Sequence, residues 1–159
     1  MQTATISQLK KELKTLTKEE LLEACLIVTK YKKENKELLS YHLFEKESEA
    51  DYINNIKIEV EELFTLINKK SPFFIKKSVR KILRLIKKYA KYSKKKETET
   101  ELLLHFCNQL IRFKPSIKNN LTLMNIYERQ ILLIEKNINA MHEDLQYDFQ
   151  LELENLNQL

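Results

Sequence analysis

The chain has 159 residues, of which 43% are hydrophobic and 32% are charged, with a formal net charge of +5. This apolar content excludes a disordered chain, and the length suits a single domain. Glycine is absent, which excludes the glycine-dependent phosphate loops, dinucleotide-binding turns and nucleophile elbows of several large enzyme classes. Long helices joined by short polar turns remain, so we expect one all-α domain spanning residues 1–159.

The first part of the chain predicts two helices. The first is short and covers residues 7–14. Thr17 and Glu20 then have the spacing of a capping box, in which each side chain bonds the backbone N–H of the other residue. The second helix follows and carries apolar residues at helical spacing, at Leu21, Cys25, Val28 and Tyr31. It either continues toward Leu43 or bends near Asn35.

The middle of the chain predicts two amphipathic helices. One covers residues 49–68, and its apolar stripe consists of Ile53, Ile56, Val60, Leu63 and Ile67. The other begins at Ser71, which is a suitable N-cap, followed by Pro72 in the first turn. We expect this helix to cover residues 71–96, with an apolar stripe at Ile75, Val79, Ile82, Ile86 and Tyr89.

A fifth helix is expected to start at a second capping box, formed by Thr98 and Glu101. It runs through Leu103, Cys107 and Leu110 and stops near Pro115. The two cysteines are not in a C-x-x-C motif. Because free cysteine is among the most buried residue types, we expect Cys25 and Cys107 to be reduced core residues.

Asn119 and Asn120 can cap a sixth helix, whose apolar residues are Leu123, Tyr127, Ile134 and Ile138. The acidic segment 143–156 either continues this helix or forms a seventh after a break near Asn139. Six or seven helices with short turns suit a helical bundle or a short α-solenoid-like array. No apolar run approaches the roughly 20 residues of a membrane span, and the N-terminus lacks a signal-peptide pattern. We therefore expect a cytoplasmic protein without membrane contact.

Nothing in the sequence predicts an enzyme. His42, His105 and His142 are isolated from one another. His142-Glu143 begins like the zinc motif H-E-x-x-H, but position 146 is Gln, and the Glu-x-x-His pairs of helical di-iron sites do not occur. We expect no catalytic residues, no metal and no cofactor.

The charge is unevenly placed along the chain. Residues 1–68 carry a net charge of −3, residues 69–96 carry 13 basic and no acidic residues, and residues 97–159 carry a net charge of −5. On the helix expected over residues 71–96, the basic residues form a face beside the apolar stripe. The candidate residues for binding phosphate or an acidic partner are Lys77, Arg80, Arg84, Lys87, Lys88 and Lys91.

Three interpretations of this basic face remain open. It binds nucleic acid, with Phe73, Phe74, Tyr89 and Tyr92 available to stack on bases. Alternatively, it binds an acidic protein surface, which includes the acidic segment 143–156 of this chain. In the third interpretation, it is a solvated face without a partner. The excess of lysine, with 24 Lys and 4 Arg in the chain, then reflects codon usage alone. The leading hypothesis is a non-enzymatic helical scaffold that binds another protein or itself, and the alternative is a nucleic-acid-binding module.

Four segments carry a family resemblance: Leu9 to Leu21, Ile82 to Tyr92, Glu101 to Leu104 and Met141 to Leu145. In their order and placement they resemble the uncharacterised bacterial family called domain of unknown function 6155. The chain departs from the glycine expected near residues 137–141, where it has Asn-Ile-Asn-Ala-Met. The resemblance implies a bacterial, helical, cytoplasmic protein, and it transfers no activity and no catalytic residues.

Overall fold

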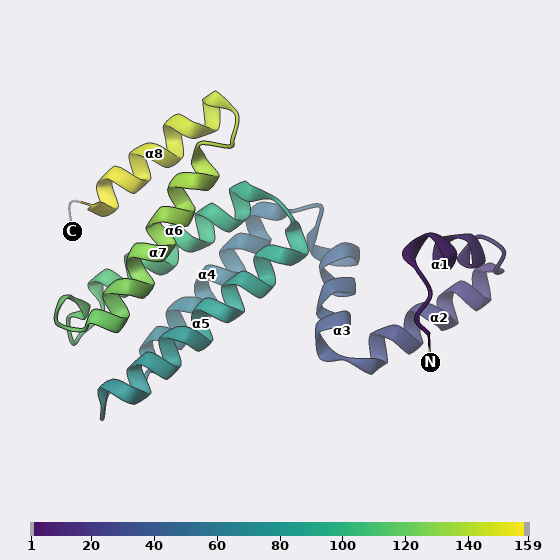
Figure 1. The fold of residues 1–159 in the computed structure, drawn as a ribbon, viewed down its shortest axis with the longest axis horizontal. Coiled ribbons are helices and arrows are strands. Elements are labelled where there is room, and N and C mark those ends of the chain that lie inside the picture. Colours follow the sequence, from purple (N-terminus) through teal and green to yellow (C-terminus); the bar gives the residue numbers. More distant parts are fainter. Residues whose placement is uncertain (1, 158–159) are drawn as a thin grey trace. The chain divides into compact units, whose positions relative to one another are not determined.

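In a computed structural model, which describes residues 2–157, every regular element is a helix. The predicted all-α class is therefore confirmed, and Figure 1 shows the helices in chain order. We expected one domain over residues 1–159. The packing instead forms two compact units, with the boundary between Phe44 and Glu45. The two units are described separately below.

The first unit contains three short helices, α1 (Ile6–Leu13), α2 (Lys18–Tyr31) and α3 (Lys33–Ser40). The predicted capping box starts α2. The backbone N–H of Thr17 donates to Glu20 Oε2 over 2.8 Å, and the backbone N–H of Glu20 donates to Thr17 Oγ1 over 3.2 Å. Two N–H groups that the helix itself leaves without acceptors are thereby satisfied.

A sharp break separates α2 from α3, so the second predicted helix bends and does not run on unbroken toward Leu43. Lys32 has extended backbone angles, with φ −141° and ψ 144°. The Asn35 side chain then donates from Nδ2 to the carbonyl oxygen of Val28 over 2.7 Å. This bond satisfies one of the carbonyl groups that the end of α2 leaves free. A short π-helix, Tyr41–Glu45, follows α3.

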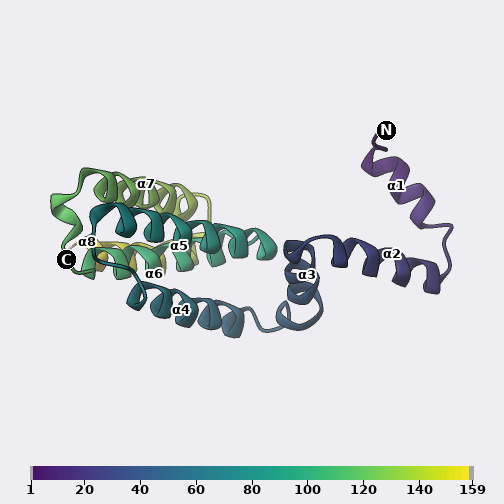
Figure 2. The same ribbon diagram turned by 90° about the horizontal axis from the view of Figure 1, so that it is seen from below.

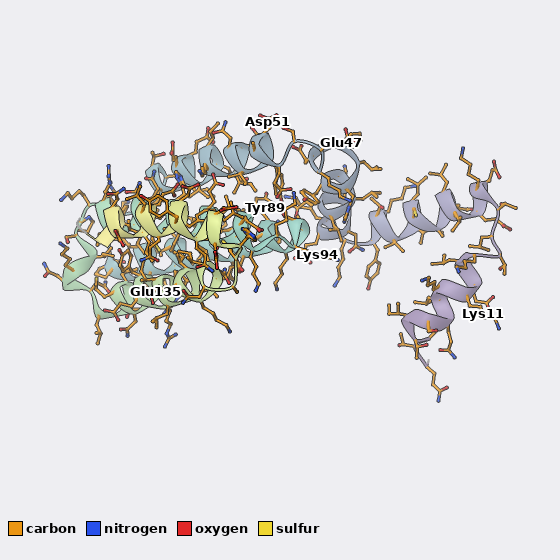
Figure 3. All side chains as sticks on the ribbon, turned by 90° about the horizontal axis from the view of Figure 1, so that it is seen from above. Lys11, Glu47, Asp51, Tyr89, Lys94 and Glu135 are labelled. Carbon is orange, nitrogen blue, oxygen red and sulfur yellow. The ribbon has the colours of Figure 1, made fainter. Side chains whose placement is uncertain are left out.

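The first unit exposes most of its apolar side chains, and none of α1, α2 and α3 contains a buried residue. Cys25 is exposed, so the prediction that it is a core residue is wrong, whereas Cys107 is buried as predicted. The physical reason is that only α3 packs extensively against α2 within this unit, which leaves much of α2 uncovered. Figure 3 shows side chains projecting from both sides of the α2 ribbon.

The second unit is a bundle of five helices, α4 (Glu49–Thr65), α5 (Pro72–Ser93), α6 (Lys96–Arg112), α7 (Leu121–Ile138) and α8 (Glu143–Asn157). Helix α6 is central, because it packs against each of the other four (Figure 2). Helix α4 also packs against α5, and α7 against α8. The bundle is therefore organised around one helix.

The core of this bundle comes from the predicted apolar stripes. Helix α6 supplies its centre with side chains no more than 5% exposed, at Leu102, Leu103, Leu104, Phe106, Cys107 and Leu110. The stripes predicted for α4, α5 and α7 are buried except for Leu63 and Tyr89, which are half-buried. Because helical periodicity places these residues on one side, their burial follows from the sequence pattern.

The turn between α5 and α6 differs from the prediction. The basic helix expected over residues 71–96 begins at Pro72 as expected but ends at Ser93. Lys94 follows in the left-handed conformation, with φ 61°. Glycine usually takes this position at the end of a helix because it has no Cβ, and here a lysine takes it.

The start of α6 also differs. The capping box predicted at Thr98 and Glu101 is wrong, because α6 begins earlier, at Lys96. Thr98 lies inside the helix, is 1% exposed, and donates from Oγ1 to Glu49 Oε1 over 2.6 Å. Its hydroxyl therefore bonds a residue of α4 and caps nothing.

The end of the chain resolves the two alternatives for the acidic segment. Asn120 caps α7 as predicted, since its Oδ1 accepts a hydrogen bond from the backbone N–H of Leu123 over 3.3 Å. Helix α7 ends at Ile138 and α8 begins at Glu143, so the acidic segment is a separate helix. Within residues 2–157 no helix is both long and apolar enough to cross a membrane.

Candidate functional site

The structure places the six candidate basic residues on α5, which carries eight cationic and no acidic side chains. Lys77, Arg80, Arg84 and Lys91 are exposed, and Lys87 and Lys88 are half-buried. These residues recur at intervals of three and four positions, so they follow one side of the helix. The predicted cationic face is therefore present on the second unit.

The charges of this cationic face are largely without carboxylate partners. Within residues 2–157, Lys77, Arg80, Arg84, Lys87 and Lys91 form no ion pair. These five cations, which repel one another where they lie one turn apart, therefore have no carboxylate within ion-pair distance in the described part of the chain. An anionic partner would relieve this repulsion.

Lys88 is the exception to this description. Its Nζ lies 4.7 Å from the centre of the Tyr89 ring. This distance is within the range of a cation–π interaction, which partly satisfies the ammonium group. Lys88 is therefore less available than Arg80 or Arg84 to bind an anion.

The aromatic residues considered for base stacking divide into two pairs. Phe73 and Phe74, in the first turn of α5, are 64% and 42% exposed. Tyr92 is only 8% exposed, so the hypothesis that it stacks on a base is wrong. Tyr89 is half-buried, and its carbonyl oxygen accepts a hydrogen bond from the Tyr52 hydroxyl over 3.0 Å. Stacking is thus open to Phe73 and Phe74.

The acidic helix α8 does not cover the cationic face. It packs against α6 and α7. Within the described residues, its carboxylates make no ion pair with α5. One of them, Asp144, has its Oδ2 3.3 Å from the imidazole Nδ1 of His142. The sequence allowed an intramolecular pairing of the basic and acidic helices, and the fold does not form it.

A second candidate site is an apolar groove in the first unit, which the sequence did not predict. It has a volume of about 340 Å³, and its lining includes Leu13, Ala24, Cys25, Val28, Leu38 and Leu39. The groove is open, since Val28 is 59% and Leu38 37% exposed. Sequence reasoning assigned Cys25 to the core because free cysteine is usually buried, and it gave Val28 as an apolar residue at helical spacing without showing what would cover it.

Further apolar side chains stand exposed elsewhere on the same unit. Each is at least 61% exposed: Ile6, Leu22, Ile27, Tyr31, Leu43 and Phe44. Single exposed apolar residues are ordinary on a monomer, whereas their concentration on one small unit is typical of an interaction surface. We call the groove and these residues together the apolar surface of the first unit.

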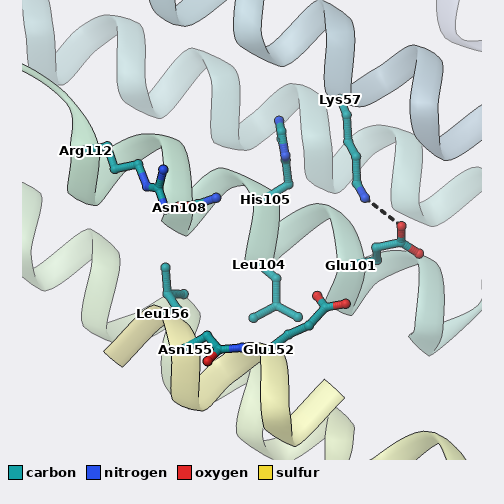
Figure 4. Close-up of a pocket in the computed structure, with 9 residues that line it drawn as sticks. All are labelled: Lys57, Glu101, Leu104, His105, Asn108, Arg112, Glu152, Asn155 and Leu156. Carbon is teal, nitrogen blue, oxygen red and sulfur yellow. Dashed lines mark hydrogen bonds and ion pairs between the residues drawn. The ribbon is translucent and has the colours of Figure 1, made fainter. Parts of the chain in front are cut away.

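A third candidate is a polar cleft of about 290 Å³ between α4, α6 and α8 (Figure 4). Its lining mixes charges of both signs and includes Lys57, Glu101, His105, Arg112 and Glu152. Lys57 Nζ lies 2.6 Å from Glu101 Oε1, so these two charges largely neutralise each other. The remaining groups would suit a small polar ligand.

His105 is the titratable group of most interest in this cleft. Burial lowers its pKa, and the nearby carboxylate of Glu61 opposes this shift. His105 Nε2 lies 3.4 Å from Glu61 Oε1 but makes no hydrogen bond within the described residues. The imidazole is therefore neutral near pH 7, and the residues lining the cleft include no hydroxyl or thiol for it to activate.

The structure does not gather metal ligands. Among residues 2–157 no three His, Cys, Asp or Glu side chains lie close enough together to hold a metal ion. Comparison with family models, with curated proteins and with solved structures finds no match to this chain. The residues described above therefore carry the functional argument by themselves.

Proposed function

We propose that this chain is a non-enzymatic helical interaction module that binds protein through the apolar surface of its first unit. The observation that carries the proposal is that α1, α2 and α3 bury no residue, although they are rich in large apolar side chains. Removing apolar surface from water contributes about 25 cal/mol per Å². A partner that covers this surface would therefore be held by the hydrophobic effect.

The composition of α2 supports the proposal. Between Leu21 and Val28 only Glu23 is charged, so apolar side chains point in nearly every direction around the helix. A helix that is apolar all round is typical of one that is covered on several sides. Helix α3 covers one side of α2, and the partner is proposed to cover another.

The size of the first unit also supports it. Folded units of about 40 residues usually need a disulfide, a metal or association with a partner. Cys25 is free, and the first unit ends before Glu45. Association is the stabilising contribution that fits these facts.

The absence of catalysis is likewise a proposal, and it is supported by the chemistry of the polar cleft. Lys57 and Glu101 are paired, and His105 lacks a nucleophile to activate. Membership in domain of unknown function 6155 and a cytoplasmic location stay predictions. Neither one adds an activity to the proposed function.

Photo-crosslinking tests the proposed binding surface. A benzophenone amino acid replaces Leu22 or Tyr31, which are 61% and 79% exposed, in the full chain expressed in cells. The matched controls carry it at Leu121 or Leu132 of the second unit, which are 78% and 64% exposed. We expect protein adducts from the first pair and none from the controls. Equal yields at all four positions, or no adducts from the first pair, would contradict the proposal.

Nucleic-acid binding through α5 is a second candidate, favoured by one specific observation. Lys77, Arg80 and Arg84 are exposed, form no ion pair within residues 2–157, and are not covered by α8. Contacts from Lys and Arg to phosphates give affinity that falls steeply with salt. This surface lies on the second unit and is independent of the apolar surface.

Fluorescence anisotropy with labelled single- and double-stranded oligonucleotides tests this candidate at low and near-physiological salt. The test variant is Lys77→Glu/Arg80→Glu/Arg84→Glu. The control makes the same change of charge on exposed residues of α1 and its end, as Lys10→Glu/Lys11→Glu/Lys14→Glu. Salt-sensitive binding that only the α5 variant loses would support the candidate. The absence of binding at low salt would reject it.

A further inference from the structure

We propose that the partner of the apolar surface is a second copy of this chain, with the two α2 helices packed antiparallel along their grooves. This inference rests on the proposed function and deepens it by naming the partner. Three features of the first unit carry it: the position of small residues on α2, the distribution of its charges, and the exposure of the groove.

The first feature is the position of the smallest side chains. Ala24 and Cys25 are the two middle residues of α2 and line the groove. Small side chains let two helices approach closely. A two-fold axis between these residues places Ala24 opposite Cys25 of the second copy. It also places Leu21 opposite Val28 of the second copy. Since these four residues recur at intervals of three, one and three positions, they form a single apolar seam.

The second feature is the charge at the two ends of α2. Residues 18–23 carry Lys18, Glu19, Glu20 and Glu23, a net charge of −2, whereas Lys30 in the last turn of α2 and Lys32 at its C-cap give a net charge of +2. An antiparallel pair brings opposite ends together, while a parallel pair brings like charges together. The helix macrodipoles also favour the antiparallel arrangement. The charge distribution therefore favours a second copy of this chain as the partner, with the two α2 helices antiparallel.

The third feature is that the seam is accessible in a single chain. Cys25 is exposed, and Val28 is 59% exposed. Each copy offers the same groove and the same helix, so one symmetric contact satisfies both copies. A closed pair of this kind leaves no α2 seam free for a third copy.

Sedimentation equilibrium of the full chain tests the association. We expect the mass to rise with concentration from 19.1 kDa to about twice that value, as for a closed two-fold pair. Val28→Glu places a charge in the seam and is expected to keep the chain monomeric. Because Val28 belongs to the first unit, the unfolding of the second unit in urea, followed by circular dichroism, should be the same in this variant as in the wild type. The control, Leu132→Glu, changes an exposed leucine of the second unit and should associate as the wild type does.

Spin labels measure the direction of the pairing. Cys25 is labelled directly, because Cys107 is fully buried. In a Cys25→Ser background, labels are placed instead at Lys18→Cys or Tyr31→Cys. An antiparallel pair gives a short distance at position 25. At positions 18 and 31 it separates the two labels by about 20 Å along the axis, at 1.5 Å per residue. Equal short distances at all three positions would show a parallel pair and overturn the inference.

The outcomes separate this inference from the proposed function. A chain that stays monomeric at all concentrations overturns self-association. If the benzophenone at Leu22 then links to a different protein, the proposed function stands and only the identity of the partner changes. A dimer that Val28→Glu leaves intact shows that the contact lies elsewhere and also overturns the inference.

Discussion

Thr98 Oγ1 donates a hydrogen bond to Glu49 Oε1 over 2.6 Å, joining residues that are 49 positions apart in the chain. The same carboxylate accepts a hydrogen bond from Ser93 Oγ, and its Oε2 lies 3.0 Å from Lys95 Nζ. The first residue of α4 thus holds the end of α5, the following turn and the start of α6. Thr98 is buried, so its hydroxyl depends on this acceptor.

Replacing Glu49 with Ala should therefore destabilise the bundle. We expect the free energy of unfolding to fall by about 2 kcal/mol, because the buried Thr98 hydroxyl is left without its acceptor. Urea unfolding followed by circular dichroism measures the change. Asp51→Ala removes an exposed carboxylate from the same turn of α4 and should change the stability by less. Equal losses in the two variants would mean that the bonds of Glu49 contribute little.

Among the residues that the structure describes, Lys94 alone has a positive φ. Replacing it with glycine should stabilise the fold. A side chain with a Cβ costs about 1 kcal/mol in the left-handed conformation, so Lys94→Gly should raise the free energy of unfolding by about that amount. Figure 3 marks Lys94 at the end of α5. Lys94→Ala removes the same charge but keeps the Cβ, and should show no such gain. If alanine and glycine stabilise equally, the effect comes from charge.

The two thiols should differ sharply in reactivity. Burial raises the pKa of the Cys107 thiol to about 12, whereas Cys25 is exposed. Because the thiolate is the reactive form, a disulfide reagent at pH 8 should modify one thiol in dilute native protein and two in denaturant. Cys25→Ser should abolish the native reaction. A slower reaction of Cys25 at high protein concentration is expected if a second copy covers the groove.

Stability should fall as the pH drops through about 6.5, with His105 contributing to the loss. Since burial lowers its pKa in the folded state, the unfolded chain takes up the proton first. The contribution of His105 is therefore complete above the unfolded pKa and is lost as the pH falls below it. The groups that face it are Glu61, whose charge reduces the shift, and the Lys57–Glu101 pair.

Urea unfolding at pH 7.5 and 5.5 measures this effect. His105→Gln should show a smaller loss of stability between the two pH values than the wild type. His42→Gln replaces an exposed histidine and should lose as much stability as the wild type. A variant at position 105 that keeps the full wild-type loss would show that other groups cause it.

The fold of the second unit followed from the sequence because its signals are local. Helical periodicity marked Ile53, Val79 and Ile134 as core residues, and each is buried. The helix start at Ser71-Pro72 and the cap at Asn120 are local as well, since a helix start involves residues within one turn, although the Ser71 side chain makes no capping hydrogen bond. Thr98 failed as a cap because its hydroxyl bonds Glu49, and local spacing contains no information about so distant a partner.

The candidate sites also differ in whether local sequence patterns predict them. The cationic face was predicted because consecutive turns of α5 carry Lys77, Arg80 and Arg84. The groove at Cys25 and Val28 was not predicted. Its residues have the pattern of a core, and they are exposed because the helices of the first unit leave them uncovered. The sequence pattern shows that these side chains favour burial, but not where their cover comes from.

Helix α5 carries eight cationic side chains and α8 carries five carboxylates, with no opposite charge on either helix. Helix α6 packs against both (Figure 1), so the two charges are held apart across the second unit. These two helices therefore contribute an electric dipole moment to the unit that its modest net charge does not reveal. Near a charged surface, it experiences a torque that turns α5 toward anions. This alignment acts over about 8 Å at physiological ionic strength and weakens as salt is added.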